Sequence, residues 1–164
     1  MVRFFGSVVC LFFPLLVFCS PKCSNFDGPK SVVENYLSYM KKEEFSKAYS
    51  FLTDEMTDGR SRSDWAGLQR KFFVGGDVSI FSISVGVPRR KVLSDPCILS
   101  ALVPNILRSR DKFNNQGTTE FEVYTVVKQA NVWKVDSLEV LFSETKIADF
   151  FPDAQIPKFY KQLK

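Results

Sequence analysis

Four carboxylates on predicted strands are the side chains best suited to acid–base chemistry. They are Glu120, Glu122, Asp136 and Glu139, with Tyr36 and Tyr124 as hydrogen-bond donors. A carboxyl group exchanges protons near neutral pH when an apolar cavity raises its pKa. In the stretch 118–128 the two glutamates share one face, and the other face carries Phe121, Val123 and Val127. Because the apolar face of a strand normally faces the core, we expect the glutamates to face water.

Other catalytic and metal-binding arrangements lack the residue types that they need. The chain has no histidine, so a Ser-His or Cys-His pair cannot form, and only a serine–lysine pair remains formally open. The pair Gly75-Gly76 lacks the spacing of a phosphate-binding loop. Without histidine or a CxxC pair, the cysteines supply too few ligands for a structural zinc site. We therefore expect no catalytic residue, no metal site and no cofactor.

The N-terminus has the pattern of a targeting segment. Residues 4–18 form an uncharged apolar run after Arg3, about as long as the apolar region of a signal peptide and short for a membrane-spanning helix. The sequence around Cys19, LVFCS, resembles the lipobox of bacterial lipoproteins, in which the cysteine is lipidated and becomes the new N-terminus. Phe18 stands where that box has a small residue. We expect a signal peptide at 1–18 and lipidation at Cys19; cleavage nearby and an uncleaved apolar anchor are the alternatives.

Two cysteines remain for pairing if Cys10 leaves with the signal and Cys19 carries lipid. Cys23 and Cys97 could form a disulfide in an oxidising compartment, but no spacing rule supports this pair, and two free thiols are the favoured alternative. Cys23 lies within residues 19–29, which are rich in Ser, Pro, Gly and Asn. We interpret this stretch as a tether between the membrane and a domain at 30–143.

The domain begins with helical patterns and continues with strand patterns. Apolar residues at helical spacing occupy 33–40 and 45–52, and the charged run 41–44 between them indicates a bend. Ser61 and Asp64 can cap another helix, which Gly75-Gly76 ends. The later strands show slips in parity near Phe81 and near Asp136, as β-bulges produce. This order predicts an α+β fold with N-terminal helices on the concave face of a curved antiparallel sheet, followed by a C-terminal extension at 144–164.

Three short motifs carry a resemblance to a known superfamily. They are Val32-Val33-x-x-Tyr36-Leu37, Phe45-x-x-Ala48-Tyr49-x-x-Leu52 and Val132-Trp133-Lys134-Val135. In this order, and before long strands, they resemble the nuclear transport factor 2-like superfamily, whose cone-shaped fold also occurs in ketosteroid isomerase. The resemblance implies a cone that encloses a cavity or a filled core, and the motifs indicate fold and not activity. We expect its apolar wall to consist of Val33, Leu37, Trp65, Phe121, Val123 and Val127.

Charge excludes one class of partner. Residues 1–18 contain Arg3 and no acidic residue, so their removal lowers the net charge from +4 to +3. A positive charge this small does not suit a nucleic-acid-binding module. Basic clusters at Arg89-Arg90-Lys91 and at Arg108, Arg110 and Lys112 are interpreted as solvated loops, with anionic lipid head groups as the alternative contact.

These observations together predict a small lipoprotein of the bacterial cell envelope. We expect a lipid-anchored, extracytoplasmic and non-enzymatic module, attached to the membrane by its N-terminal lipid, that binds a small apolar ligand or a protein partner. A structural subunit of an envelope complex is one alternative. An isomerase or hydro-lyase is another, and a buried carboxylate with a pKa near neutrality beside a tyrosine would favour it.

Overall fold

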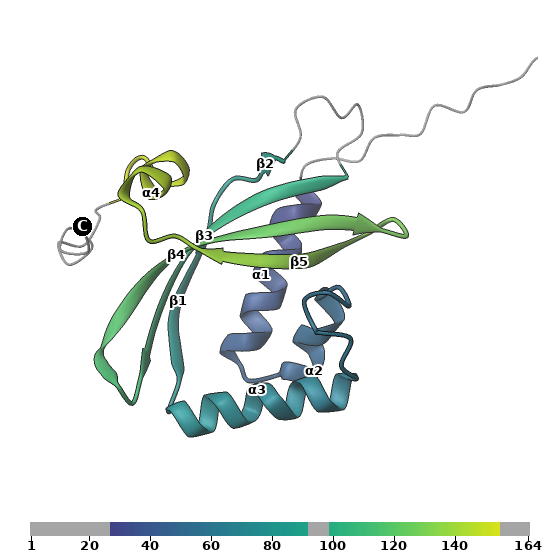
Figure 1. Ribbon diagram of the computed structural model, residues 1–164, viewed down its shortest axis with the longest axis vertical. Coiled ribbons are helices and arrows are strands. Elements are labelled where there is room, and N and C mark those ends of the chain that lie inside the picture. The colour runs from purple at the N-terminus through teal and green to yellow at the C-terminus, as the bar shows by residue number, and fades with distance from the viewer. Residues whose placement is uncertain (1–26, 92–98, 155–164) are drawn as a thin grey trace, which may run out of the picture.

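The computed structural model describes residues 27–91 and 99–154 (Figure 1). The predictions for the signal peptide, for Cys19 and for the Cys23–Cys97 pair lie outside these residues. No helix in the two described ranges is both long and apolar enough to span a membrane.

Antiparallel strands form one curved sheet. They are β1 (Ser79–Val85), β2 (Arg89–Arg90), β3 (Ser100–Asp111), β4 (Asn114–Gln129) and β5 (Val132–Val140). The spatial order is β1-β3-β4-β5, and the short β2 also pairs with β3. Figure 1 shows β3 and β4 as long, bent strands, with α1 on one side of the sheet. The predicted α+β fold with a curved antiparallel sheet is confirmed.

Irregular register in the strands produces this curvature. The pairing of β1 with β3 shifts between Ile80 and Ser82, so Phe81 is the extra residue. In β5, Val135 pairs with Val126 and Ser137 with Thr125, which leaves Asp136 without a partner in the ladder. Both positions match the parity slips in the sequence, because one extra residue reverses the direction of every later side chain.

The helices follow their local signals closely. They are α1 (Asp27–Lys41), α2 (Phe45–Ala48), the 3₁₀ turn η1 (Tyr49–Phe51), α3 (Arg62–Gly76) and α4 (Glu144–Phe150). The expected bend after α1 is present, and Glu43 there has a φ of 56°. Ser61 caps α3 by accepting a hydrogen bond from the Asp64 backbone N–H at 3.2 Å. α3 ends at Gly76, and Asp77 takes the left-handed conformation at its C-terminus.

The central part of the sheet is buried on both of its faces. One apolar cluster fills the space between the concave face and the first three helices, and Val33, Phe45 and Val126 lie at its centre with no exposed surface. A second cluster lies on the opposite, convex face, where α4 covers Phe121 and Val123. The ring of Phe121 packs on that of Phe151 with centroids 5.2 Å apart. α4 therefore makes a second layer, on the convex face of the sheet.

Candidate functional site

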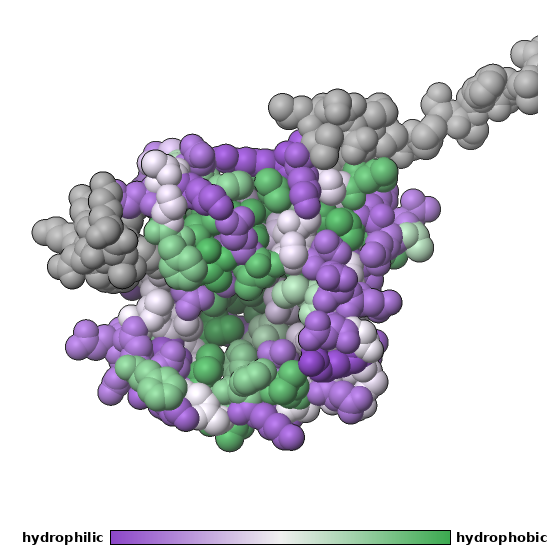
Figure 2. All heavy atoms as spheres, viewed as in Figure 1, coloured by the Kyte–Doolittle hydropathy of each residue, from purple (hydrophilic) through white to green (hydrophobic). Residues whose placement is uncertain are grey.

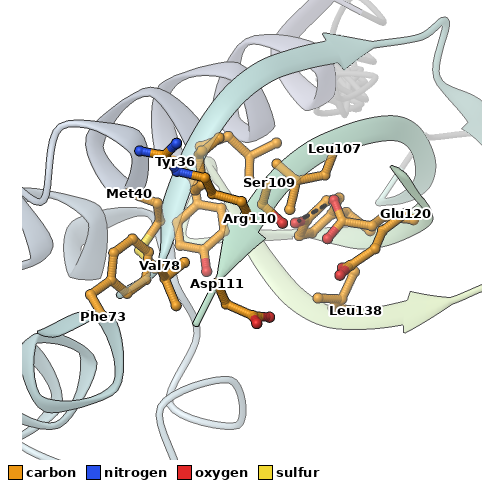
Figure 3. A pocket seen from close by; sticks show the side chains of 14 residues that line it. Tyr36, Met40, Phe73, Val78, Leu107, Ser109, Arg110, Asp111, Glu120 and Leu138 are labelled. Atoms are coloured by element: carbon orange, nitrogen blue, oxygen red, sulfur yellow. Dashed lines mark hydrogen bonds between the residues drawn. The ribbon is translucent and has the colours of Figure 1, made fainter. Parts of the chain in front are cut away.

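A cavity of about 290 Å³ opens between α1, the end of α3 and the concave face of the sheet (Figure 3). Figure 2 shows a hollow on this face of the molecule with hydrophobic side chains around it. The volume is at the lower end of the range for small-molecule sites, roughly 300–1,000 Å³. Half of the lining is apolar: Leu37, Met40, Phe73, Val78, Ile80, Leu107 and Leu138. The other half is polar: Tyr36, Ser109, Arg110, Asp111, Glu120, Glu122 and Tyr124.

Glu122 is the buried acid of this cavity. Its residue is 3% exposed, and its Oε2 accepts hydrogen bonds from Asn105 Nδ2 at 2.7 Å and from the Tyr124 hydroxyl at 3.0 Å. The pKa of Glu122 is raised to about 7. Burial is the main cause, the charge of Glu120 adds to it, and the two hydrogen bonds act in the opposite direction. Both donors bond to Oε2. The second oxygen, Oε1, can therefore take up a proton or contact a bound molecule. Glu122 is therefore poised to gain or lose a proton near neutral pH.

The expectation that this glutamate faces water is wrong. Residues Phe121 to Thr125 of β4 are all buried, because α1 covers one face of the strand and α4 covers the other. A strand that is buried on both faces loses the polar–apolar alternation by which its inner face is recognised. The even-numbered side chains, Glu122 and Tyr124, line the concave cavity.

The six residues expected to line the cavity occupy four different places. Leu37 lines it. Val33 and Trp65 belong to the core cluster around it, while Phe121 and Val123 lie on the convex face under α4. Val127 is half-buried further along β4 and is not part of the lining. The reversed parity of β4 accounts for the three strand residues.

The remaining candidate carboxylates differ in their surroundings. Glu120 lies two residues before Glu122 on the same side of β4 and lines the cavity; partial burial and the nearby Asp111 raise its pKa. Asp136 and Glu139 are outside the cavity lining. Glu139 is exposed and forms an ion pair of 2.6 Å with Lys146 of α4. The cavity thus holds two carboxyl groups whose pKa values are raised, one buried and one at its edge.

Tyr36 projects from α1 into the cavity (Figure 3). It is 7% exposed, its ring meets that of Tyr124 edge-to-face with centroids 6.1 Å apart, and its hydroxyl has no hydrogen-bond partner in the described part of the chain. Burial, followed by the nearby Glu122, raises its pKa well above the usual value, so Tyr36 remains a neutral donor. A buried hydroxyl without a partner is costly unless a bound molecule or water completes it.

Asn105 is the site residue that our sequence reasoning missed. It is fully buried in β3 directly opposite Glu122, and its Oδ1 accepts a hydrogen bond from the Ser84 backbone N–H at 3.1 Å. That bond turns the amide so that Nδ2 points at Glu122. The available signal was a single amide inside the apolar run 97–107, because a polar residue on a buried strand requires a partner.

We expect Asn105→Ala to raise the pKa of Glu122 by about one pH unit, because the charged carboxylate loses a hydrogen bond. The measurement is a carbon-13 NMR titration of glutamate carboxyl groups, with the Glu122 resonance assigned through Glu122→Gln. A pKa that is unchanged in Asn105→Ala would show that this bond does not support the charged form.

The described residues contain no group of three or more His, Cys, Asp or Glu placed to hold a metal ion. The groups of the cavity that can act on a bound molecule are the carboxyls of Glu120 and Glu122 and the phenol of Tyr36, beside an apolar wall.

Comparison with known proteins addresses the fold. No protein-family model matches the chain, and no curated protein matches it significantly. A solved domain of unknown function with a cystatin-like fold from Nostoc punctiforme is similar over 82% of this chain and 88% of its own, with 13% identity and a TM-score of 0.50. The chain has a cystatin-like, nuclear transport factor 2-like fold. The predicted fold is thereby confirmed.

Two further solved structures are similar to this cystatin-like chain. A ketosteroid isomerase-like protein from Erwinia carotovora atroseptica has 16% identity and a TM-score of 0.48, over 69% of this chain and 92% of its own. The Bd1075 protein of Bdellovibrio bacteriovorus has 12% identity and a TM-score of 0.47 over 68% of this chain, which spans only 39% of that protein. At such identities, similarity of fold says nothing about activity.

Proposed function

We propose that the cavity binds a small, mainly apolar molecule and that Glu122 exchanges a proton with it, the chemistry of an isomerase or hydro-lyase. The observation that carries the proposal is the burial of Glu122 in the cavity wall with a pKa of about 7. Near neutral pH both the ionised and the protonated forms of Glu122 are then populated, which suits a group that must act in both.

The arrangement suits proton transfer next to a carbonyl group. Ionised Glu122 would remove a proton from the carbon beside the carbonyl, and the proton would move to Oε1. Negative charge would then develop on the carbonyl oxygen, where the free hydroxyl of Tyr36 can donate a hydrogen bond. Return of the proton from Glu122 to another carbon completes an isomerisation. Asn105 and Tyr124 keep the carboxyl oriented throughout through their bonds to Oε2.

The test uses β-tetralone, an apolar bicyclic ketone with acidic protons beside its carbonyl, in deuterium oxide. We expect the wild-type protein to speed exchange of these protons, as followed by proton NMR. Glu122→Gln should lower the rate by about 10²-fold or more, because general acid–base groups contribute roughly 10²–10⁴-fold. Glutamine keeps the size of the side chain and removes its titration.

Glu139→Gln is the matched control, because Glu139 is exposed outside the cavity and bonds to Lys146. This variant should exchange deuterium at the wild-type rate. Equal rates for wild type and Glu122→Gln would remove Glu122 from the reaction.

Binding without turnover is the second candidate, and the engagement of Tyr124 favours it. Its hydroxyl is bound to Glu122, so of the two phenols only that of Tyr36 is free to contact a ligand. In that case β-tetralone would perturb resonances of cavity residues in wild type without accelerated exchange. The location in the cell envelope, through lipid on Cys19, stays a prediction from the sequence.

A further inference from the structure

A hairpin tip and a helix end project hydrophobic side chains into solvent at one end of the molecule. Phe113 lies in the turn between β3 and β4 and is 86% exposed, and Phe72 and Val74 in the last turns of α3 are 60% and 73% exposed. Figure 2 shows hydrophobic atoms among hydrophilic ones at the lower left, over the ends of α3 and of this hairpin. We call Phe72, Val74 and Phe113 the apolar tip.

Hydrogen bonds hold the two parts of the apolar tip together. The backbone N–H of Lys112 donates to the carbonyl of Gly76 at 2.8 Å, and Lys112 Nζ donates to the carbonyl of Gly75 at 2.5 Å. These bonds use carbonyls at the end of α3 that the helix leaves without partners. The hairpin turn and the helix end therefore form one continuous surface.

The charged residues around the apolar tip carry an excess of one positive charge. Segments 71–77 and 110–114 contain the cations Lys71, Arg110 and Lys112 and the acids Asp77 and Asp111. Asp111 lines the cavity, and its carboxylate accepts bonds from the backbone N–H groups of Phe113 and Asn114, so it shapes the turn. The ammonium group of Lys112 lies 5.1 Å from the ring centroid of Phe113.

We propose that the apolar tip docks on an anionic lipid bilayer and places the mouth of the cavity at the membrane surface. A ring that projects from a turn and is flanked by cations suits the interface of an anionic bilayer, where apolar side chains enter the headgroup region and Lys or Arg meet lipid phosphates.

Part of the cavity lining adjoins the apolar tip in the chain. Phe73, which lines the cavity, lies between Phe72 and Val74 in sequence, and Arg110 and Asp111 of the lining directly precede Lys112 and Phe113. A small apolar molecule dissolved in the bilayer would therefore reach the cavity without crossing water. This access route rests on the proposed function, whereas the docking itself does not.

The test measures how deeply the side chain at position 113 of the full-length chain enters the bilayer. Phe113→Trp is mixed with phosphatidylcholine–phosphatidylglycerol vesicles that contain a lipid brominated near the headgroup end of its acyl chains. Bromine should quench the emission of the new tryptophan by roughly half, since interfacial side chains enter about 5–10 Å. Wild type, with Trp65 and Trp133, supplies the background.

Phe142→Trp is the matched control, because Phe142 is also exposed, at 68%, but follows β5 outside the apolar tip. Attachment through the N-terminal segment alone would quench both positions equally or neither, and either result would overturn the proposal. Only selective quenching at position 113 supports it.

A second arm tests the charge. Arg110→Gln and Lys112→Gln are each added to Phe113→Trp. On anionic vesicles, each should raise the lipid concentration that gives half-maximal quenching by about fivefold. Glutamine at position 112 keeps a donor for the carbonyl of Gly75. An unchanged response in both variants, or equal quenching on vesicles of phosphatidylcholine alone, would exclude an electrostatic contact with the bilayer.

Discussion

The wild-type protein should lose about 3 kcal/mol of unfolding free energy through Glu122 as the pH rises from about 4.5 to above about 7. Burial raises the pKa of this carboxyl from 4.5 to about 7, so the folded protein holds its proton more tightly than the unfolded chain does. The stabilisation is complete below the unfolded pKa and disappears as the pH passes the folded pKa. This direction is opposite to that of an acid stabilised by an ion pair.

The measurement is denaturant unfolding of wild type and Glu122→Gln at about pH 5 and about pH 8. Groups far from Glu122 titrate equally in both proteins, so the difference between the two reports on Glu122 together with Glu120, whose charge is coupled to it. We expect Glu122→Gln to gain stability relative to wild type at the higher pH. A difference between the proteins that does not depend on pH would show that the carboxyl is solvated and that the proposed acid–base site is not formed.

Phe121→Ala should destabilise the fold by about 3–5 kcal/mol and leave the cavity intact. Phe121 is 1% exposed and lies on the convex face between the sheet and α4, in contact with Phe151. Truncation leaves a void that close-packed neighbours fill only partly. The cavity lies on the other side of β4, so binding of β-tetralone, followed by NMR, should keep its wild-type affinity.

Phe142→Ala is the control for this prediction, because Phe142 is 68% exposed and its removal should change stability by less than about 0.5 kcal/mol. If Phe121→Ala weakens β-tetralone binding while the fold stays intact, then this ring faces the cavity, and the placement of the two faces of β4 is wrong.

The sequence by itself determined the elements whose signals are local. Ser61 caps α3 because a hydroxyl at that position satisfies a backbone N–H three residues later. The bulges at Phe81 and Asp136 were predictable because side chains alternate with a period of two, so an extra residue leaves a visible slip. The resemblance to a nuclear transport factor 2-like fold followed from the order of these elements.

Only the tertiary structure decided which face of β4 meets the cavity. The sequence indicated one apolar face and one mixed face, but α4 packs on the apolar face and leaves Glu122 and Tyr124 for the concave side. The pairing of Asn105 with Glu122 depends on the register between β3 and β4, and the shift in that register between Ser109 and Asp111 leaves no visible slip in the sequence. The pKa of Glu122 follows from its burial in the cavity wall and from its bonds to Asn105 and Tyr124, because burial and partners, and not residue type, set the cost of its charge.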